Sequence, residues 1–232
     1  MSELKVVVVA DLHGELPEIP PCDLLLIAGD ICPDIDHSCG FQEAWLETSF
    51  KWWLRKTELE VKKIVFVAGN HDFIFQDRKS AAYRVLKELP ATYLEDDHCY
   101  YNDLKIYGTP WQLYHGGWAF NLYEPDLKIK WDKIPEDTDI LVCHSPPVGY
   151  GDKAPRTITD ENETSWPEPE HVGSPSLLER IKVIQPKLVV FGHIHSGFGQ
   201  WQLNDTILVN AAQAGHPPRL PVIINLTVND EK

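Results

Sequence analysis

An apolar run in the first third of the sequence stops abruptly at residues that can do chemistry. Ile64–Ala68 is short, rich in β-branched residues and free of charge, which is typical of a strand buried on both faces. Gly69 follows and lets the backbone turn closely past a neighbour. Asn70 offers an amide oxygen to a hard cation, His71 brings an imidazole that can give or take a proton, and Asp72 could hold that imidazole in one tautomer.

Four other apolar runs end in a similar way. They cover 6–10, 24–28, 140–143 and 188–191, and the ligand-type residues that follow them are Asp11, His13, Asp30, His144, His193 and His195. In an open α/β sheet, ligand sites collect outside the carboxyl ends of the strands. One shared site beyond five strand ends would explain all of these residues.

Two of the strand ends place ligand-type residues at alternate positions. Asp11 and His13 are separated by one residue, as are His193 and His195. On a short extended segment, side chains at alternate positions face the same side. The spacing therefore predicts two chelating pairs.

The donor set combines carboxylates, imidazoles and an amide, from Asp11, His13, Asp30, Asn70, His144, His193 and His195. This mixture suits manganese, iron, zinc or nickel better than calcium, and we expect manganese first. Seven groups are too many for one ion but fit two ions that share a carboxylate. Such a pair, roughly 3.5–4 Å apart, can activate a bridging hydroxide and clamp a phosphoryl oxygen. His71 then acts as a general acid worth about 10²- to 10⁴-fold in rate, with Asp72 as its partner or, alternatively, as an N-cap.

The charge balance argues against a nucleic-acid polymer as a partner. The chain has 232 residues, with 35 Asp plus Glu against 21 Lys plus Arg, for a formal net charge of −14. This charge repels polyanions, whereas bound divalent metals could still attract a small anionic substrate. The five cysteines include no CxxC pair, so we expect reduced thiols. No apolar stretch is long enough for a signal peptide or a membrane span, so we expect a cytoplasmic protein without a membrane partner.

Helical and strand patterns follow one another without a repeat or a linker, so residues 1–232 are expected to form one domain. Helices are predicted over 41–59, 77–89 and 175–184, the last with Ser174 as N-cap. The tryptophans of the first helix are expected in the core. Strands are predicted over 91–94, 98–101, 104–108, 199–203, 206–209 and 222–228. Asn102-Asp103 is the predicted hairpin turn of the second and third of these.

Three segments between these elements are candidates for the rim of the site. Residues 31–40 are interpreted as a polar turn. The aromatic loop 109–120 could hold a flat group or could plug a sheet edge, and the two readings carry equal weight. Loop 149–173 lacks periodicity and follows His144, so it is a candidate substrate-selecting loop. Its Arg156 is a candidate phosphate ligand, with a loop salt bridge or plain exposure as alternatives.

The order of these blocks resembles the signature of the calcineurin-like metallophosphoesterases. The matching positions are Asp11-x-His13, Gly29-Asp30, Gly69-Asn70-His71-Asp72, His144 and Gly192-His193-x-His195, which span almost the whole chain. The resemblance implies an α/β (α+β) fold, a four-layer αββα sandwich of two mixed β-sheets flanked by helices. It implies a first metal site made by Asp11, His13, Asp30 and His195, and a second made by Asp30, Asn70, His144 and His193. His71 would be the acid and Asp72 its partner.

Further segments are similar to a small single-domain subgroup of cyclic-nucleotide phosphodiesterases, and they cover 107–112, 117–121, 139–147 and 186–195. Some members of that subgroup carry a glycine where this chain has His193, so a competent second metal site is expected here. One departure is Pro33, where many relatives have an acidic residue, and the nearest acid is Asp34. Cys143 stands where glycine or threonine is commoner, and no nucleophilic role is inferred for it.

The residues and the resemblance together predict a dinuclear phosphoesterase for small phosphate esters. The preferred form is a phosphodiesterase, with 2′,3′-cyclic nucleotides as candidate substrates and Asn70, His71 and Arg156 as substrate contacts. A phosphomonoesterase would differ only in whether the pocket accepts a second ester group. A catalytically silent scaffold would be marked by lost ligands or a lost acid, whereas these positions are retained. A nuclease is disfavoured by the acidic charge and by the absence of a basic stripe.

Overall fold

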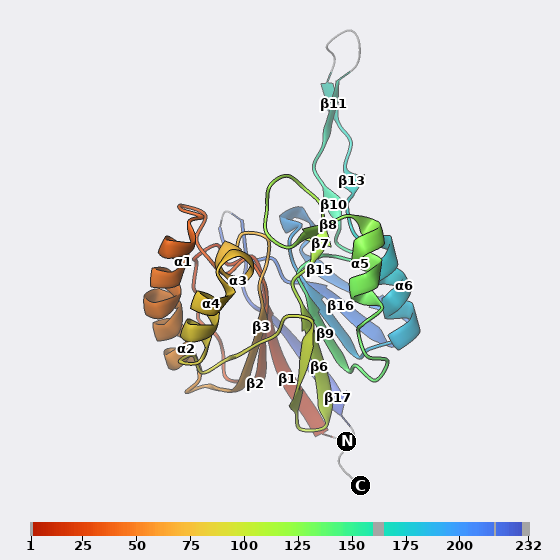
Figure 1. The fold of residues 1–232 in the computed structure, drawn as a ribbon. Coiled ribbons are helices and arrows are strands. Elements are labelled where there is room, and N and C mark those ends of the chain that lie inside the picture. Colours follow the sequence, from red (N-terminus) through yellow and green to blue (C-terminus); the bar gives the residue numbers. More distant parts are fainter. Residues whose placement is uncertain (1, 160–164, 216, 229–232) are drawn as a thin grey trace.

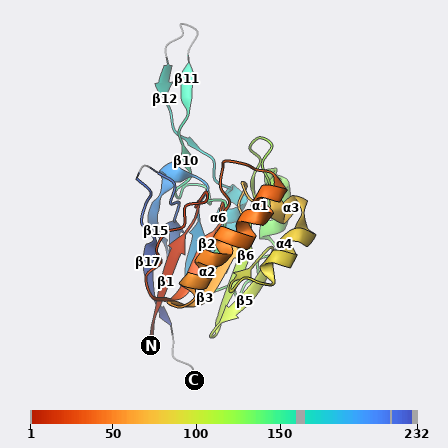
Figure 2. The ribbon, with the colours of Figure 1, turned by 90° about the vertical axis from the view of Figure 1, so that its left-hand side faces the viewer.

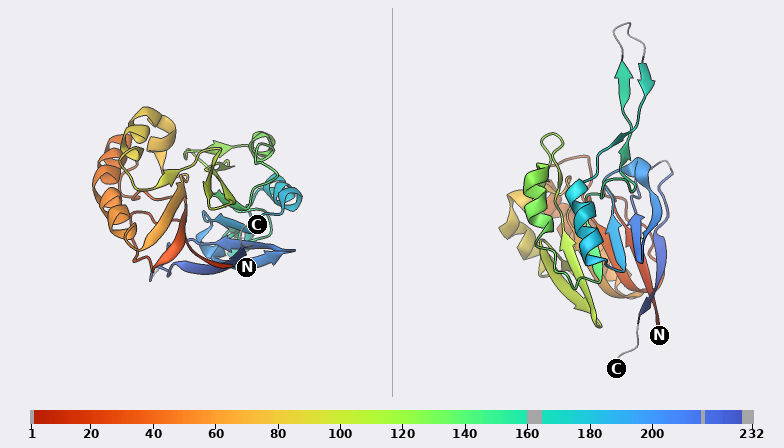
Figure 3. Two further views of the ribbon diagram at one scale, coloured as in Figure 1. Left: turned by 90° about the horizontal axis from the view of Figure 1, so that it is seen from below. Right: turned by 90° about the vertical axis from the view of Figure 1, so that its right-hand side faces the viewer.

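The computed structural model describes residues 2–159, 165–215 and 217–228. Two mixed β-sheets pack face to face, and helices cover the outer face of each sheet (Figures 1 and 3). The predicted four-layer sandwich is therefore confirmed. Among the helices in the described ranges, none combines the length and apolar character that crossing a bilayer requires.

The first sheet has the strand order β17-β1-β2-β3-β4. Its strands are β1 Ser2–Val9, β2 Cys22–Ala28, β3 Val61–Val67, β4 Thr92–Tyr93 and β17 Val222–Val228. β17 is antiparallel to β1, and the remaining pairs are parallel. Because side chains alternate along a strand, Val6 and Val8 pack between the sheets while Val7 and Val9 pack under the helices.

The second sheet has the strand order β15-β16-β14-β9-β6-β5. Its strands are β5 Asp97–Tyr101, β6 Leu104–Thr109, β9 Ile140–Cys143, β14 Leu188–Phe191, β15 Gly199–Leu203 and β16 Thr206–Asn210. The edge pairs β5–β6 and β15–β16 are antiparallel, and the inner pairs are parallel. The predicted hairpin turn is confirmed, with Asn102 in a left-handed conformation.

Two groups of helices close the sandwich on its outer faces. The first sheet is covered by α1 Cys39–Trp45, a π-helical segment Leu46–Phe50, α2 Lys51–Thr57, α3 Phe73–Asp77 and α4 Lys79–Leu86. The second sheet is covered by α5 Glu124–Trp131 and α6 Pro175–Ile184. Phe50 and Phe66 are fully buried between the first sheet and its helices, and Trp131 and Phe191 are fully buried between the second sheet and its helices. Burial of these large rings is a main source of the stability of each layer.

The helix boundaries differ from the sequence prediction in two places. The predicted helix 41–59 contains a π-helical turn, and a π turn holds more residues than an α turn and so rotates the later residues about the axis. Trp53 is buried as expected, but Trp52 is 71% exposed, so its predicted core position is wrong. The predicted helix 77–89 is interrupted at Arg78, and α4 begins one residue later.

The described residues of loop 149–173, which are 149–159 and 165–173, form an arm that projects from one end of the sandwich (Figures 1 and 2). Its base is the ribbon of β10 Lys153–Ala154 with β13 Glu170–His171, and its outer part is the ribbon of β11 Thr157–Thr159 with β12 Ser165–Pro167. The aromatic loop carries β7 Gln112–Leu113, which pairs in parallel with β8 Asn121–Leu122. Both segments flank the same end of the molecule.

Candidate metal centre

Five strands deliver the predicted ligands to one end of the sandwich. β1, β2 and β3 belong to the first sheet, β9 and β14 to the second, and the segments that follow them meet beneath the arm (Figure 1). Hydrogen bonds join the two sheets there. The backbone N–H of His193 lies 2.9 Å from both carboxylate oxygens of Asp11, and His144 Nδ1 lies 2.9 Å from the carbonyl oxygen of Ala28.

The backbone turns sharply at four of these side chains. The φ angles of Asp11, His13, Asp30 and His193 are 51°, 45°, 52° and 67°. Positive φ is uncommon outside glycine and costs about 1–3 kcal/mol, and it clusters at functional sites. The extended geometry expected for Asp11-x-His13 and His193-x-His195 is therefore wrong, and each segment aims its side chains by turning.

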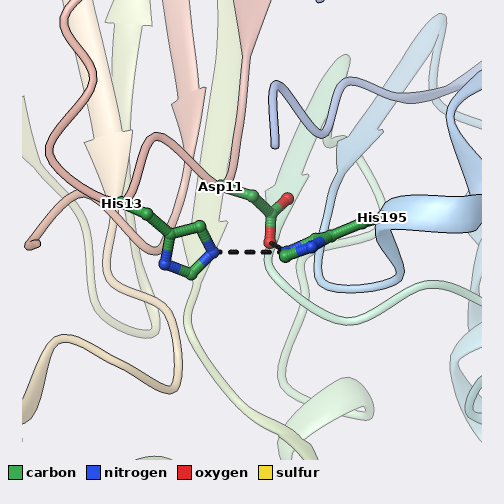
Figure 4. A group of neighbouring side chains, drawn as sticks. All are labelled: Asp11, His13 and His195. Atoms are coloured by element: carbon green, nitrogen blue, oxygen red, sulfur yellow. Dashed lines mark hydrogen bonds and ion pairs between the residues drawn. The ribbon is translucent and has the colours of Figure 1, made fainter. Parts of the chain in front are cut away.

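The first ligand group joins β1 to the segment after β14. Asp11, His13 and His195 offer one ligand atom each within 4.8 Å of one another (Figure 4). His13 Nε2 lies 3.2 Å from His195 Nε2, which in turn lies 3.4 Å from Asp11 Oδ1. Two imidazole nitrogens that face each other need a proton or a cation between them, because two lone pairs repel.

The second ligand group lies between β2, β9 and β14. Asp30, His144 and His193 form it, again within 4.8 Å. The amide oxygen of Asn70 faces both imidazoles, 2.8 Å from His144 Nε2 and 2.9 Å from His193 Nδ1. His193 and His195 thus belong to different groups, and the chelate predicted for that pair is wrong.

Asp30 lies between the two groups. Its Oδ2 is 3.9 Å from His13 Nε2 and 3.3 Å from His144 Nε2. Its other oxygen accepts the backbone N–H of His71 at 2.8 Å. The position suits a carboxylate shared by two cations. Gly69 makes room for it, since a β-carbon there would collide with the Asp30 carboxylate.

Burial and charge act against each other in the second group. Burial alone would raise the pKa of Asp30, but its imidazole neighbours, above all His144, hold that pKa well below the usual range. Burial alone would lower the pKa of His144, but the charge of Asp30 and the hydrogen bonds raise it to about 9. Burial, reinforced by His144, lowers the pKa of His193 to about 3. Asp30 is therefore ionised and His193 is neutral, so both can serve as ligands, and a bound cation would displace the proton that the raised pKa keeps on His144.

His71 stands beside the two groups, and Asp34 holds its ring. His71 Nδ1 lies 2.7 Å from Asp34 Oδ1, and the same oxygen lies 2.8 Å from His13 Nδ1. Trp118 stacks on the ring of His71, with centroids 4.1 Å apart and planes at 28°. Burial would raise the pKa of Asp34, but the hydrogen bonds from His13 and His71 hold it well below its usual range. Asp34 therefore orients both imidazoles.

Asp72 is turned away from that ring, contrary to the expected pairing. Its carboxylate accepts backbone N–H groups of Ile31 at 3.2 Å and of Cys32 and Gly69 at 2.8 Å. It occupies the N-cap position of α3 but makes no side-chain bond to that helix. Burial and the nearby charge of Asp30 raise its pKa. Asp72 joins the segment after β2 to the segment after β3, so it supports Asp30 and Asn70 indirectly.

A pocket of about 540 Å³ opens beside the ligand groups. Its floor includes Asn70 and His71 with residues of both groups, one wall belongs to the aromatic loop, and the other belongs to the base of the arm. Arg156 is not among the described residues that line it. Its guanidinium bonds Glu170 at 2.7 Å on the arm, which fits the loop salt bridge named as an alternative.

The two readings of the aromatic loop apply to different residues. Trp111 packs edge-on against the buried Phe120 and donates to Asp96 at 2.9 Å, so it closes the sheet edge. Trp118 lines the pocket and stacks on His71. Sequence reasoning missed this contact and the role of Asp34. The sequence did contain a signal for Asp34. Many relatives have an acidic residue at the position of Pro33, and Asp34, one position later, is the first acid after Asp30.

The donor set fits two divalent transition-metal ions. The two groups combine imidazoles, carboxylates and one amide oxygen, contain no thiolate, and share Asp30. Asp11, His13, Asp30 and His195 would hold one ion, and Asp30, Asn70, His144 and His193 would hold the other.

Such a constellation at the strand ends of an αββα sandwich is typical of metal-dependent phosphoric ester hydrolases. Residues 4–197 match the family model of the calcineurin-like phosphoesterases, and the chain belongs to this family. It is 31% identical to human metallophosphoesterase domain-containing protein 1, over 96% of this chain and 71% of that one. It is 30% identical to a UPF0046 protein of Caenorhabditis elegans, over 93% of this chain and 76% of that one. Among solved structures, TT1561 of Thermus thermophilus shares the fold, with a TM-score of 0.55, 14% identity, and coverage of 90% of this chain and 89% of that one.

Proposed function

We propose that this protein is a dinuclear metal-dependent phosphodiesterase that acts on small phosphate esters, with manganese as the preferred metal. One observation carries the proposal, namely that two ligand groups from both sheets meet at the carboxylate of Asp30. When bound, two such ions supply Lewis-acid stabilisation of the phosphoryl charge and a water of lowered pKa. Candidate substrates include 2′,3′-cyclic nucleotides.

The chain's own residues supply proton transfer and orientation. His71 lies next to the ligand groups and lines the pocket, so its Nε2 can protonate a leaving oxygen of the ester. Asp34 holds the opposite ring nitrogen at 2.7 Å and fixes the orientation of the ring. Trp118 covers one face of the imidazole and limits the access of water to it. The amide oxygen of Asn70 faces His144 and His193 at 2.8 and 2.9 Å, so it would be a further ligand beside these two imidazoles.

The space beside the ligand groups supports a diester over a monoester. A pocket of about 540 Å³ is much larger than a phosphate group, and its aromatic and arm walls can receive a second substituent. The net charge of −14 supports a small substrate rather than a nucleic-acid polymer, and a cytoplasmic location remains part of the proposal.

The test is a substrate panel on chelator-treated protein to which manganese, iron, zinc or nickel is returned. We expect metal-dependent hydrolysis of bis(p-nitrophenyl) phosphate and of cyclic nucleotides, with slower hydrolysis of p-nitrophenyl phosphate. Preference for the monoester would replace the phosphodiesterase by a phosphomonoesterase. Tight metal binding without hydrolysis of any ester would identify a catalytically silent member of the family.

A further inference from the structure

A second aspartate–histidine pair lies at the pocket wall, outside the two ligand groups. Asp152 is 1% exposed, and its Oδ1 lies 2.7 Å from His171 Nδ1. Its Oδ2 accepts the backbone N–H of Gly173 at 3.1 Å. An ionised carboxylate can only accept, so Nδ1 of His171 carries the proton of this hydrogen bond, and in that tautomer Nε2 holds the free lone pair and can accept. The side chain of His171 is 47% exposed and lines the pocket.

The pair is fixed relative to the ligand groups. His171 pairs with Lys153 in the ribbon at the base of the arm. Ser196 Oγ donates to the carbonyl of Lys153 at 2.7 Å, and Ser196 directly follows the ligand-group residue His195. Asn210 at the end of β16 donates to the carbonyl of Gly151 at 3.0 Å. Both bonds fix the segment 151–153, and the pairing of His171 with Lys153 holds the imidazole at the pocket wall, close to the ligand groups.

The two pocket walls differ in chemistry. On the arm side, the carboxylate of Glu170, which is paired with Arg156, and the Nε2 of His171 are both acceptors. On the other side, Tyr114 and Trp118 present aromatic rings. A wall of acceptors favours a group with hydroxyl or amine donors, and an aromatic wall favours a flat ring. A nucleoside carries both.

We propose that His171, held by Asp152, is a specificity-determining residue that accepts a hydrogen bond from a hydroxyl or amine of a nucleoside esterified to the scissile phosphate. The inference rests on the proposed phosphodiesterase function and narrows its substrate class to nucleoside phosphate esters. Asp152 acts through His171 and is a positioning residue.

The test compares two esters that release the same p-nitrophenolate. One is the p-nitrophenyl ester of thymidine 5′-phosphate, and the other is bis(p-nitrophenyl) phosphate, which lacks the sugar and the base. His171→Ala should lower the ratio of their kcat/KM values about three- to tenfold, as expected for one lost hydrogen bond, through a higher KM for the nucleoside ester. His171→Gln, whose amide oxygen can also accept, should recover most of the ratio. His98→Ala is the matched control, because His98 is 41% exposed on β5, away from the pocket, and this variant should keep the wild-type ratio.

Asp152→Asn should raise the KM for the nucleoside ester without a comparable fall in kcat. A lower melting temperature with an unchanged ratio would overturn the positioning role. An equal fall for both esters in His171→Ala, or no fall, would overturn the role of His171 and leave the phosphodiesterase proposal standing. Wild-type protein that hydrolyses neither ester with any of the four metals would overturn the proposed function, and this inference with it.

Discussion

Replacement of Asp34 by asparagine removes one charge that serves two imidazoles. Its Oδ1 lies 2.7 Å from the Nδ1 of His71 and 2.8 Å from the Nδ1 of His13. The amide keeps the size of the side chain, so the loop needs no rearrangement. The variant therefore isolates the contribution of the carboxylate to the acid and to the first ligand group.

The expected effect follows from the strength of the two contacts. A hydrogen bond to a charged group contributes about 1.5–3 kcal/mol. Because the side chain of Asp34 is 52% exposed, solvent screening reduces each contact to about 1 kcal/mol. At His71, a loss of about 1 kcal/mol in the transition state lowers kcat roughly fivefold. At His13, the same loss of about 1 kcal/mol lowers the metal affinity roughly fivefold.

The two effects are measured separately. The kcat for bis(p-nitrophenyl) phosphate is taken at saturating manganese, and the affinity comes from a manganese titration of the chelator-treated protein. Asp36→Asn is the matched control, because Asp36 lies in the same loop and its carboxylate accepts only the nearby backbone N–H of Ser38 at 2.8 Å among its described hydrogen bonds. If Asp34→Asn and Asp36→Asn give the same kcat and the same manganese affinity, Asp34 does not orient the imidazoles and the reasoning is refuted.

Three further outcomes test other parts of the site. His71→Ala should keep its metal content while its kcat falls about 10²- to 10⁴-fold. Asp30→Ala should lose both activity and metal, and elemental analysis of the purified variants measures the metal content. Full activity in His71→Ala would show that His71 is not the general acid. Gly192→Ala would place a β-carbon against the carboxylate of Asp11 and should lower both the metal content and the melting temperature. Gly117→Ala is the control, because a β-carbon there meets open space among the described residues and should change neither quantity. In metal-free protein the pKa of His144 is raised from 6.5 to about 9, so the folded state binds more protons than the unfolded state between these values. Its contribution to stability is full below pH 6.5 and is lost as the pH rises through 9, so urea midpoints with chelator present should fall from pH 7 to pH 9.5; a constant or rising midpoint would contradict this.

The strand ends were predictable because each one combines two local signals. A short apolar run indicates a buried strand, and polar ligand-type residues directly after it mark the carboxyl end of the sheet. Residues 64–72 show both signals, and the structure places Asn70 and His71 where that pattern expects them. The layered fold was likewise predictable, because the motif order resembles one family and the helix and strand patterns are strongly periodic.

The partners of individual side chains were not predictable from spacing. His193 and His195 are separated by one residue but serve different ligand groups, because His193 adopts a left-handed backbone and contacts Asp11 and Asn70, which are distant in the chain. Asp72 lies next to His71 in the chain, yet Asp34 holds the ring. Sequence proximity gave the wrong partner because Asp72 accepts from three buried backbone N–H groups. Leaving those groups unpaired would destabilise the fold by more than one hydrogen bond to His71 would stabilise it.

The sequence by itself determined which residue types gather at the site, since periodicity and the order of the blocks are properties of the chain. Only the tertiary structure decided how those residues divide into two groups around Asp30 and which acid orients His71. It also decided which residues at the base of the arm line the pocket. The physical reason is that these outcomes depend on contacts between segments far apart in the chain. Such contacts become specific only when both sheets have packed and the backbone has turned at each ligand.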